Sequence, residues 1–482
     1  MTDIEALMWR LGAHDPKLRP TMSLVVAFDG AVDRALLRAR IERLAHRVPA
    51  LRRRVDAGLL GAVPPRWEPD PDFSLSHHLQ VARPAGPAGV PGGGAGPGAA
   101  PPDAWTVATD VLSAPFPPGR PPWRVVLVPG PPDTLVLHLH HSYTDGLGGV
   151  TLLGELFDLG GGPSAGVPGA TDPGPGRAYG PGPDPAPGSE SAGRPTGPLD
   201  GLQQDLQAQM GRALRLAGRV VPWAARSVRA ASQRPDLVLR NAGDLMGTLR
   251  THLAAATGPG SPVLQPRSAG VRLAAVDLPL ESLRGAGRRL GATVNDVYLG
   301  GLLEGLARYH EKCAVLPPSL RLAVPISARN PTGDEPGMHN HLHGALMRGP
   351  LGPLDFDERT RLVHEMMDHA RRQPWLPWLE DAAGVATRLP GAVGVVAAAL
   401  GSVDVVASNV TGPPVPLHLG GVVVGSMVPV GPRSGSAVNA TLLSYRDRAG
   451  VGLNIDPVSV GEPDVLVDCI RSAFADHLPE SD

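Results

Sequence analysis

A pair of histidines followed by an aspartate and a glycine is the part of this sequence that most directly suggests chemistry. Residues 140–146 read HHSYTDG and follow an apolar stretch, TLVL at 134–137. A neutral imidazole has a pKa close to neutral pH, so it can remove a proton from a hydroxyl group under ordinary conditions. The glycines at 146, 148 and 149 permit a tight turn that would present the imidazole at a cleft. The run therefore indicates a general base.

Two other interpretations of this segment stay open at the level of sequence. A histidine pair between a strand and a turn can be a hydrogen-bonded surface feature. Metal binding by His138, His140 and Asp145 is the second alternative, but this spacing matches no common zinc pattern. On a strand, His138 and His140 would point to one face and His141 to the other. We therefore expect no metal here.

Four motifs, in order along the chain, resemble those of the bacterial wax ester synthase/diacylglycerol acyltransferase family of the CoA-dependent acyltransferase superfamily. They are the HHxxxDG run, Arg120-Pro121-Pro122-Trp123, the pair Asn295-Asp296, and the NxxGP run from Asn409 to Pro413. Proline stands at residue 122 where the family has leucine. The resemblance extends from about Ile4 to the C-terminus and is interrupted by low-complexity insertions.

The resemblance implies a role for each residue of the HHxxxDG run. The second histidine, His141, is the catalytic base, and His140 belongs to the same catalytic motif with a structural role. The motif aspartate, Asp145, forms an ion pair with an arginine, for which Arg329 is the matching position. An aspartate held by arginine is shifted toward its charged form, which makes it a poor general base at neutral pH.

The other motif residues are expected to contact the substrates. Asn295 is a candidate donor to the oxyanion of the reaction, although capping a helix is an equally good explanation. The NxxGP residues would shape the crossover between two halves of the protein, beside the acyl or CoA channel. The expected substrate contacts are Gly146, Asp296, Asn409, Gly412, Pro413 and Trp123.

Length and composition set limits on fold and location. A chain of 482 residues favours two domains, and a net charge of -2 gives no reason to expect nucleic acid as a partner. Two cysteines form no disulfide framework and favour a reducing compartment. The N-terminus lacks a signal-peptide pattern, and the apolar run at 389–406 is too interrupted to span a membrane. These features predict a cytoplasmic protein. The family resemblance implies acyl-CoA as co-substrate and no cofactor.

Glycine and proline are concentrated in two segments. The chain contains 61 glycines and 55 prolines, and residues 84–103 and 160–198 consist largely of these two with alanine and serine. Such segments contain too few bulky apolar residues to offset the entropy lost on ordering, which predicts disordered or loosely ordered loops. The second contains a formal GxSxG match at Ser164. No strand precedes it and no helix follows, so we interpret this hydrolase pattern as accidental.

Between the insertions, hydrophobic periodicity alternates between the periods of helix and strand. It predicts strands at residues 22–28, 124–128, 134–139, 271–276, 319–325, 341–347, 420–429, 438–445 and 450–455, and helices at residues 32–46, 149–156, 281–290, 295–309, 357–372 and 463–477. The predicted organisation is an N-terminal half at 1–159, a low-complexity linker at 160–198, a helical connector at 199–270 and a C-terminal half at 271–482. The fold class is α/β of the α+β sandwich type. The resemblance implies two chloramphenicol-acetyltransferase-like domains of mixed sheet plus helices.

The connector is rich in arginine. Residues 202–250 contain eight arginines and three aspartates, with Trp223 near the middle. Such a stretch could rest on an anionic membrane or a lipid droplet, and a peripheral protein of the inner membrane is then expected. An ordinary solvated face of a linker helix is the alternative.

The function implied by the resemblance is transfer of a fatty acyl group from acyl-CoA to a hydroxyl acceptor, with His141 as general base. Diacylglycerol would give triacylglycerol, and a long-chain alcohol would give a wax ester. One alternative is an acyltransferase or condensation-like enzyme of secondary metabolism with another acceptor. A second is a non-catalytic paralogue that binds lipid, although no motif is missing from the chain.

Overall fold

The computed structural model describes residues 1–57, 65–83, 103–143, 146–160, 259–327, 342–372 and 391–478. The chain divides into two compact units, one of 1–56, 65–181 and 255–482, and one of 57–64 and 182–254. The second unit lies outside the described residues, except for residue 57. The predicted linker beyond Gly160 and the predicted connector helices also lie outside the described residues. The account below concerns the first unit.

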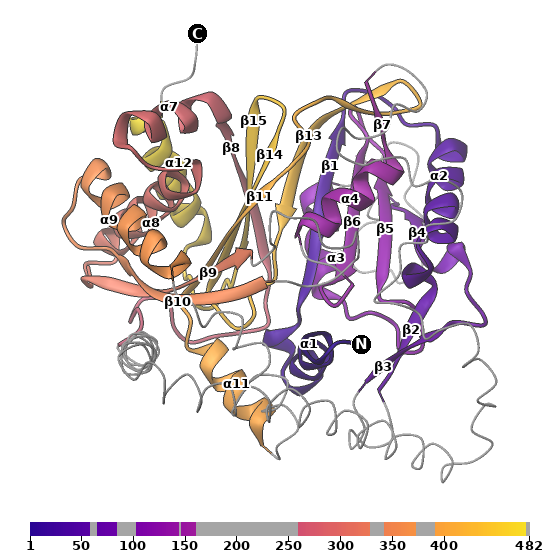
Figure 1. Cartoon of the computed structure of the whole chain (residues 1–482), viewed down its shortest axis with the longest axis horizontal. Coiled ribbons are helices and arrows are strands. Elements are labelled where there is room, and N and C mark those ends of the chain that lie inside the picture. Colours follow the sequence, from indigo (N-terminus) through magenta and orange to yellow (C-terminus); the bar gives the residue numbers. More distant parts are fainter. Residues whose placement is uncertain are drawn as a thin grey trace, which may run out of the picture. The chain divides into compact units, whose positions relative to one another are not determined.

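The described residues before the linker form one set of elements (Figure 1). These are α1 (Asp3–His14), η1 (Pro16–Leu18), β1 (Thr21–Phe28), α2 (Arg34–Arg47), η2 (Pro49–Arg52), β2 (Arg53–Asp56), β3 (Arg66–Pro69), η4 (Leu75–His77), β4 (Leu79–Val81), α3 (Ala104–Ser113), β5 (Trp123–Val128), β6 (Thr134–His140), α4 (Gly146–Leu156) and β7 (Asp158–Leu159).

The described residues after the connector form a second set. These are β8 (Arg272–Pro279), α7 (Leu280–Leu290), α8 (Val294–Lys312), β9 (Ser319–Ser327), β10 (Leu342–Pro350), α9 (Phe356–Arg371), α11 (Ala392–Gly401), β11 (Val405–Thr411), β12 (Leu417–Leu419), β13 (Val422–Val430), β14 (Val438–Tyr445), β15 (Arg448–Ile455) and α12 (Pro463–His477).

The first sheet has the strand order β4-β5-β6-β1-β13-β12-β7 and carries the histidine pair. Its central strands are rich in valine and leucine, whose side chains alternate between two buried faces. Leu135 packs with α2 and α4 on one face. Val136 packs with residues of α3 on the other. Because both faces of β6 are covered, its register is fixed up to the residue where the strand ends.

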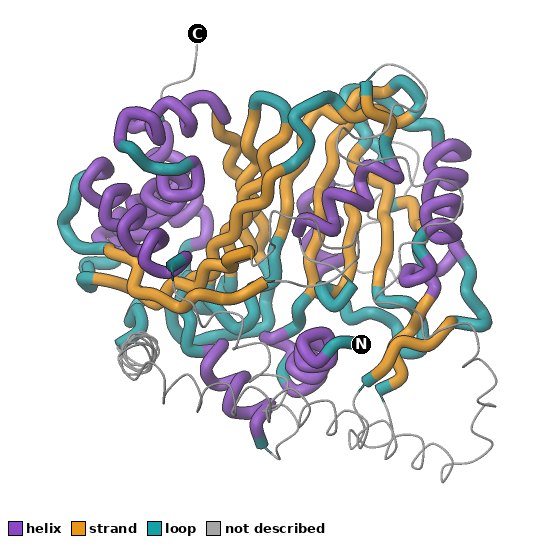
Figure 2. The backbone as a smooth tube through the Cα atoms, in the orientation of Figure 1, coloured by secondary structure: helices purple, strands orange, loops and turns teal. Residues whose placement is uncertain are grey.

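The second sheet has the order β10-β9-β11-β14-β15-β8, and α7, α8, α9 and α12 lie against it (Figure 2). Helix α8 is buried on most sides, and glycines let its neighbours approach closely. A Cβ on Gly301 would lie 2.2 Å from the ring of Phe474, and a Cβ on Gly305 would lie 2.5 Å from the backbone of Ile470. These contacts hold α12 directly against α8.

The chain crosses between the two sheets. Strands β12 and β13 come from the C-terminal half, yet β13 pairs antiparallel with β1 in the first sheet, with Ser23 opposite Val430. Where β13 passes β15, Gly452 is required, because a Cβ there would lie 1.7 Å from the carbonyl oxygen of Pro429. Residues 271–482 therefore supply strands to both sheets.

The predicted fold class is confirmed, because two mixed sheets are each packed with helices. Each strand and helix predicted outside the connector has a counterpart within a few residues. The prediction missed α1, α3, α11, the hairpin of β2 and β3, and the strands β4, β7, β11 and β12. No helix in the described ranges is long and apolar enough to cross a bilayer.

Candidate active site

The histidine pair lies where β6 ends, between the ends of its two neighbouring strands. The backbone N–H of His140 donates to the carbonyl of Pro122, just before β5, at 3.0 Å. The next N–H, that of His141, donates to the carbonyl of Pro20, just before β1, at 2.7 Å. The two hydrogen bonds go to opposite sides, so the backbone of the pair is fixed from both. His141 is half-buried, whereas His140 is buried.

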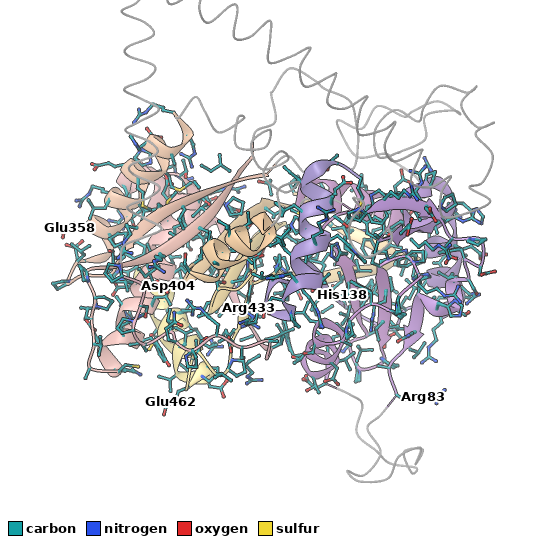
Figure 3. The ribbon with its side chains drawn as sticks, turned by 90° about the horizontal axis from the view of Figure 1, so that it is seen from below. Arg83, His138, Glu358, Asp404, Arg433 and Glu462 are labelled. Atoms are coloured by element: carbon teal, nitrogen blue, oxygen red, sulfur yellow. The ribbon has the colours of Figure 1, made fainter. Side chains whose placement is uncertain are left out.

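The third histidine of this strand, His138, which Figure 3 labels, is buried, with 1% of its surface exposed. Its Nδ1 lies 2.8 Å from the hydroxyl oxygen of Ser23, and its ring stacks on Phe116 at 4.7 Å. Burial, followed by the positive charge of Arg124, lowers the pKa of His138 to about 3. It stays neutral at ordinary pH and is enclosed by protein.

His140 is held in one tautomer by the residue two positions on. Its Nδ1 lies 3.2 Å from the backbone nitrogen of Ser142 and 2.7 Å from the hydroxyl oxygen of the same residue. A backbone N–H can only donate, so Nδ1 accepts and the proton of the neutral ring is on Nε2. Burial and the neighbouring His141 lower the pKa of His140 to about 3. This geometry favours a structural role for His140.

The motif Arg120-Pro121-Pro122-Trp123 packs inside the first unit. The ring of Trp123 is buried, donates from Nε1 to the carbonyl of Leu51 at 2.7 Å and stacks on His78 at 4.3 Å. Arg120 donates to the carbonyl of Asp72 at 2.8 Å and lies 3.6 Å from the carboxylate of Asp70. The described contacts of this motif thus fix the segment around η2 and β3. The predicted contact of Trp123 with substrate stays a prediction.

The pair Asn295-Asp296 begins helix α8. The N-cap is Thr293, so the capping role that the sequence left open for Asn295 belongs to another residue. Asp296 is fully buried, and its Oδ2 accepts from the backbone N–H of Thr293 at 2.9 Å, from its hydroxyl at 2.8 Å and from Nδ1 of His364 at 2.8 Å. The guanidinium of Arg371 is 3.8 Å from its other oxygen. These contacts hold the first turn of α8, and the predicted contact of Asp296 with substrate stays a prediction.

The NxxGP run forms the start of the crossover, as the sequence predicted. Asn409 is exposed on β11, and Gly412 follows that strand. A Cβ on Gly412 would lie 2.2 Å from the carbonyl oxygen of Ser444, so only glycine fits beside β14. The carbonyl of Pro413 accepts from the backbone of Arg446 at 3.2 Å. These contacts direct the chain out of the second sheet toward β12.

Part of the predicted site lies outside the described residues, including Asp145 and Arg329, and their ion pair stays a prediction. Gly146 begins α4. The sequence analysis missed the side chains that surround the histidine pair, notably Ser142 and Tyr143, which occupy variable positions of the motif. In the ranges that the structure describes, no three metal-ligating side chains are grouped.

Comparison with known proteins extends over nearly the whole chain. Residues 1–298 match the wax ester synthase/diacylglycerol acyltransferase catalytic domain, and residues 340–476 match the WS/DGAT C-terminal domain. A Mycobacterium tuberculosis H37Rv protein provisionally named a diacylglycerol O-acyltransferase is 30% identical over 484 residues, covering 98% of this chain and 91% of the relative. A second M. tuberculosis H37Rv protein with the same kind of name is 28% identical and covers 92% of this chain and 88% of its own.

Two solved structures show the same fold. The wax ester synthase/diacylglycerol acyltransferase from Marinobacter aquaeolei VT8 has a TM-score of 0.60 at 19% identity, with 98% of each chain covered. The first condensation domain of the calcium-dependent antibiotic synthetase has a TM-score of 0.56 at 17% identity, with 99% of this chain and 96% of the domain covered. At such identities the likeness concerns the fold alone.

Proposed function

The chain belongs to the wax ester synthase/diacylglycerol acyltransferase family and is an acyltransferase, and we propose that it transfers a fatty acyl group from acyl-CoA to a hydroxyl acceptor with His141 as the general base. The acceptor is diacylglycerol, which gives triacylglycerol, or a long-chain alcohol, which gives a wax ester. The names of the relatives favour diacylglycerol.

The observation that carries this proposal is the contrast within the histidine pair. His140 is buried and held as a neutral acceptor, while His141, one residue on, is half-buried on the opposite side of the chain. A side chain that must meet two substrates needs this partial access, because both have to reach the same imidazole. The pair thus separates a buried histidine that holds the turn from a half-buried one, to which we assign the proton transfer.

In the proposed reaction, His141 accepts the proton of the acceptor hydroxyl while the hydroxyl oxygen attacks the thioester carbonyl of acyl-CoA. The carbon–sulfur bond breaks, and the imidazolium of His141 returns the proton to the CoA thiolate. No acyl-enzyme and no cofactor are required. The pKa of His140, lowered to about 3, means that His140 adds no second positive charge beside the imidazolium.

The remaining assignments stay proposals. Asn295, half-buried at the start of α8, is the candidate donor to the oxyanion, and the crossover at Asn409, Gly412 and Pro413 is the candidate wall of the acyl or CoA channel. Lipid substrates partition into membranes and droplets, so peripheral contact with such a surface remains part of the proposal.

A product assay tests the proposed function. The purified protein is incubated with radiolabelled palmitoyl-CoA and, separately, with dioleoylglycerol, hexadecanol and a set of smaller alcohols and amines, and the lipid products are resolved by thin-layer chromatography. We expect labelled triacylglycerol or wax ester together with stoichiometric free CoA. Transfer only to small alcohols or amines would contradict the lipid acceptor. A folded protein that transfers to none of these acceptors would contradict the proposed activity.

A further inference from the structure

We propose that helix α1 acts as a brace that positions the turn from His140 to Tyr143, and that Glu5, Trp9 and Trp67 are positioning residues for acyl transfer. The inference rests on the proposed role of His141, which lies inside this turn. It concerns residues that none of the four sequence motifs contains.

Helix α1 has a well-defined start. Thr2 accepts from the backbone N–H of Glu5 at 3.2 Å, and the backbone N–H of Thr2 donates to the carboxylate of Glu5 at 3.0 Å. This reciprocal capping box fixes the first turn of the helix. Leu11 and Ala6 are buried, so the helix is also held by packing. A rigid helix can hold another segment in place.

The first contact between α1 and the turn is made by Trp9. Its ring lies 4.9 Å from the ring of His140, centroid to centroid, at an angle of 53°. His140 is 5% exposed, and its other ring contact within the turn is the hydrogen bond to Ser142. Trp9 therefore covers the residue immediately before His141.

The second contact reaches the far end of the turn through Trp67 of β3. The Nε1 of Trp67 donates to the carboxylate of Glu5 at 3.2 Å, and its ring stacks on Tyr143 at 4.8 Å with an interplanar angle of 22°. Glu5 is 1% exposed, so this hydrogen bond is shielded from water. Helix α1 is thereby linked to the second residue after His141.

Tyr143 is itself tightly fixed. It is 3% exposed, its hydroxyl donates to the carbonyl of Arg53 at 3.0 Å, and burial raises its pKa well above the ordinary value. Its backbone N–H donates to the carbonyl of His140 at 3.1 Å, which closes the turn. His140 and Tyr143 are thus the two ends of one closed loop of backbone, and α1 contacts one end directly and the other through Trp67.

This arrangement matters because acyl transfer requires the imidazole to meet both reacting oxygen and leaving sulfur. A displacement of about 1 Å of a catalytic group can reduce the rate by about 100-fold. At the Tyr143 end the turn is stabilised by the ring stack of Trp67 and its shielded hydrogen bond to Glu5, and at the His140 end by the ring contact of Trp9. Loss of one end should let the turn, and with it His141, shift relative to the acceptor.

The test compares variants that remove the brace with variants that preserve it. Trp67→Leu removes both the stack on Tyr143 and the hydrogen bond to Glu5, whereas Trp67→Phe keeps the stack. Trp9→Leu removes the ring contact with His140. Glu5→Ala removes the acceptor, and Glu5→Gln keeps it together with the capping box. Trp105→Leu is the matched control, because Trp105 is a half-buried tryptophan on α3 outside these contacts.

Two readouts are used: kcat with KM for palmitoyl-CoA, and the ratio of free fatty acid to ester product. A shifted His141 activates water in place of the acceptor, so the ratio rises, whereas partial unfolding lowers both products equally. We expect Trp67→Leu and Trp9→Leu to lower kcat by about 10- to 100-fold, with KM little changed and a raised ratio. The kcat of Trp67→Phe should lie between those of the wild type and Trp67→Leu. Glu5→Ala should lower kcat and Glu5→Gln should keep it near the wild-type value. Trp105→Leu should leave the product ratio unchanged.

Wild-type kcat and ratio in folded Trp67→Leu or Trp9→Leu would overturn the brace. Where the leucine variants do not fold, the milder variants Trp67→Phe and Glu5→Gln provide the test. The proposed brace would also be overturned if kcat and KM of Trp67→Phe equal the wild-type values and Glu5→Gln does not differ from Glu5→Ala. His141→Ala separates this inference from the proposed function. Full transfer activity in His141→Ala would contradict the proposed role of His141 as the base. An inactive His141→Ala together with unaffected Trp9 and Trp67 variants would contradict only the proposed role of α1.

Discussion

The turn after β6 and the first turn of α8 both carry sequence motifs rich in polar groups, and the two differ in where those groups are directed. In the turn, His140 is buried and bonded to Ser142, while His141 keeps partial access. At the start of α8, the carboxylate of Asp296 is fully buried and accepts from Thr293 and His364. The first motif divides its residues between support and chemistry. In the second motif, the contacts of Asp296 begin and hold a helix.

The difference shows why two motifs that are equally recognisable in the sequence need not both take part in the reaction. A residue is required at a position when no other residue can make its contacts, and this applies to a helix cap as much as to a general base. Substitutions can separate the two cases, because loss of support lowers stability and loss of the base lowers turnover of a folded protein.

His141→Ala is the substitution with the largest expected effect. Removal of a general base typically lowers the rate by about 10²- to 10⁴-fold. Since the backbone of His141 is held by its N–H bond to Pro20, which alanine retains, the thermal unfolding midpoint should stay near that of the wild type. Steady-state kinetics and a thermal melt on the same preparation check both statements. Near-wild-type turnover in a folded His141→Ala protein would rule out His141 as the base.

Asp296→Ala tests the other side of the comparison. It removes the capping box of α8 and the partner of His364, and loss of a cap together with hydrogen bonds to a charged group should reduce the free energy of unfolding by about 2–3 kcal/mol. Turnover per folded molecule should change little. Urea denaturation and steady-state kinetics on the same folded preparation provide the two numbers. A large fall in kcat without loss of stability would instead place Asp296 in the reaction.

The sequence was sufficient for much of the first motif and less so for its surroundings. The strand, the turn and the alternation of His138 and His140 against His141 follow from local pattern. The contact of Trp67 with Glu5 joins residues 62 positions apart in the chain, and no periodicity signals it. Helix α1 could have been found, since Thr2 and Glu5 have the spacing of a capping box.

Long-range pairing also limits what can be inferred about the fold. The strand predicted at 420–429 has a local pattern typical of β-structure, but its pairing with β1 of the other half depends on a partner about 400 residues away along the chain. The apolar run at 389–406 was judged too interrupted to span a membrane, and it forms α11 followed by the start of β11. Local sequence thus determines the elements, and tertiary contacts determine which sheet they join.

The pH dependence of stability sharpens the contrast further, because the histidines of β6 are buried as neutral groups. The pKa of His138 is lowered from 6.5 to about 3, so the unfolded chain binds the proton more readily between these two values. Stability from this group is complete above pH 6.5 and is lost as the pH falls toward 3. The expected loss between pH 6.5 and pH 5 is roughly 2 kcal/mol for one such group.

His138→Gln checks this assignment, since glutamine does not titrate in this range. The urea midpoint of the wild type should fall between pH 7 and pH 5, and the variant should show a smaller fall from its own value at pH 7. Other groups titrate equally in both proteins, so the difference in slope isolates His138. Parallel slopes would mean that the native protein takes up the proton at His138 without a penalty.

The smallest expected effects come from deleting one hydroxyl in each region. Ser142→Ala removes the 2.7 Å hydrogen bond to His140, and Thr293→Ala removes the 2.8 Å hydrogen bond to Asp296 together with the N-cap. Each should reduce the free energy of unfolding by about 1 kcal/mol. Only Ser142→Ala should also lower kcat, because His140 can then shift beside His141. The fall should be only a few fold, since His140 keeps one weaker hydrogen bond, from the backbone N–H of residue 142 at 3.2 Å. Paired measurements of stability and kcat decide between the two regions: equal kcat values in both variants would show that the support of His140 is not coupled to the chemistry of its neighbour.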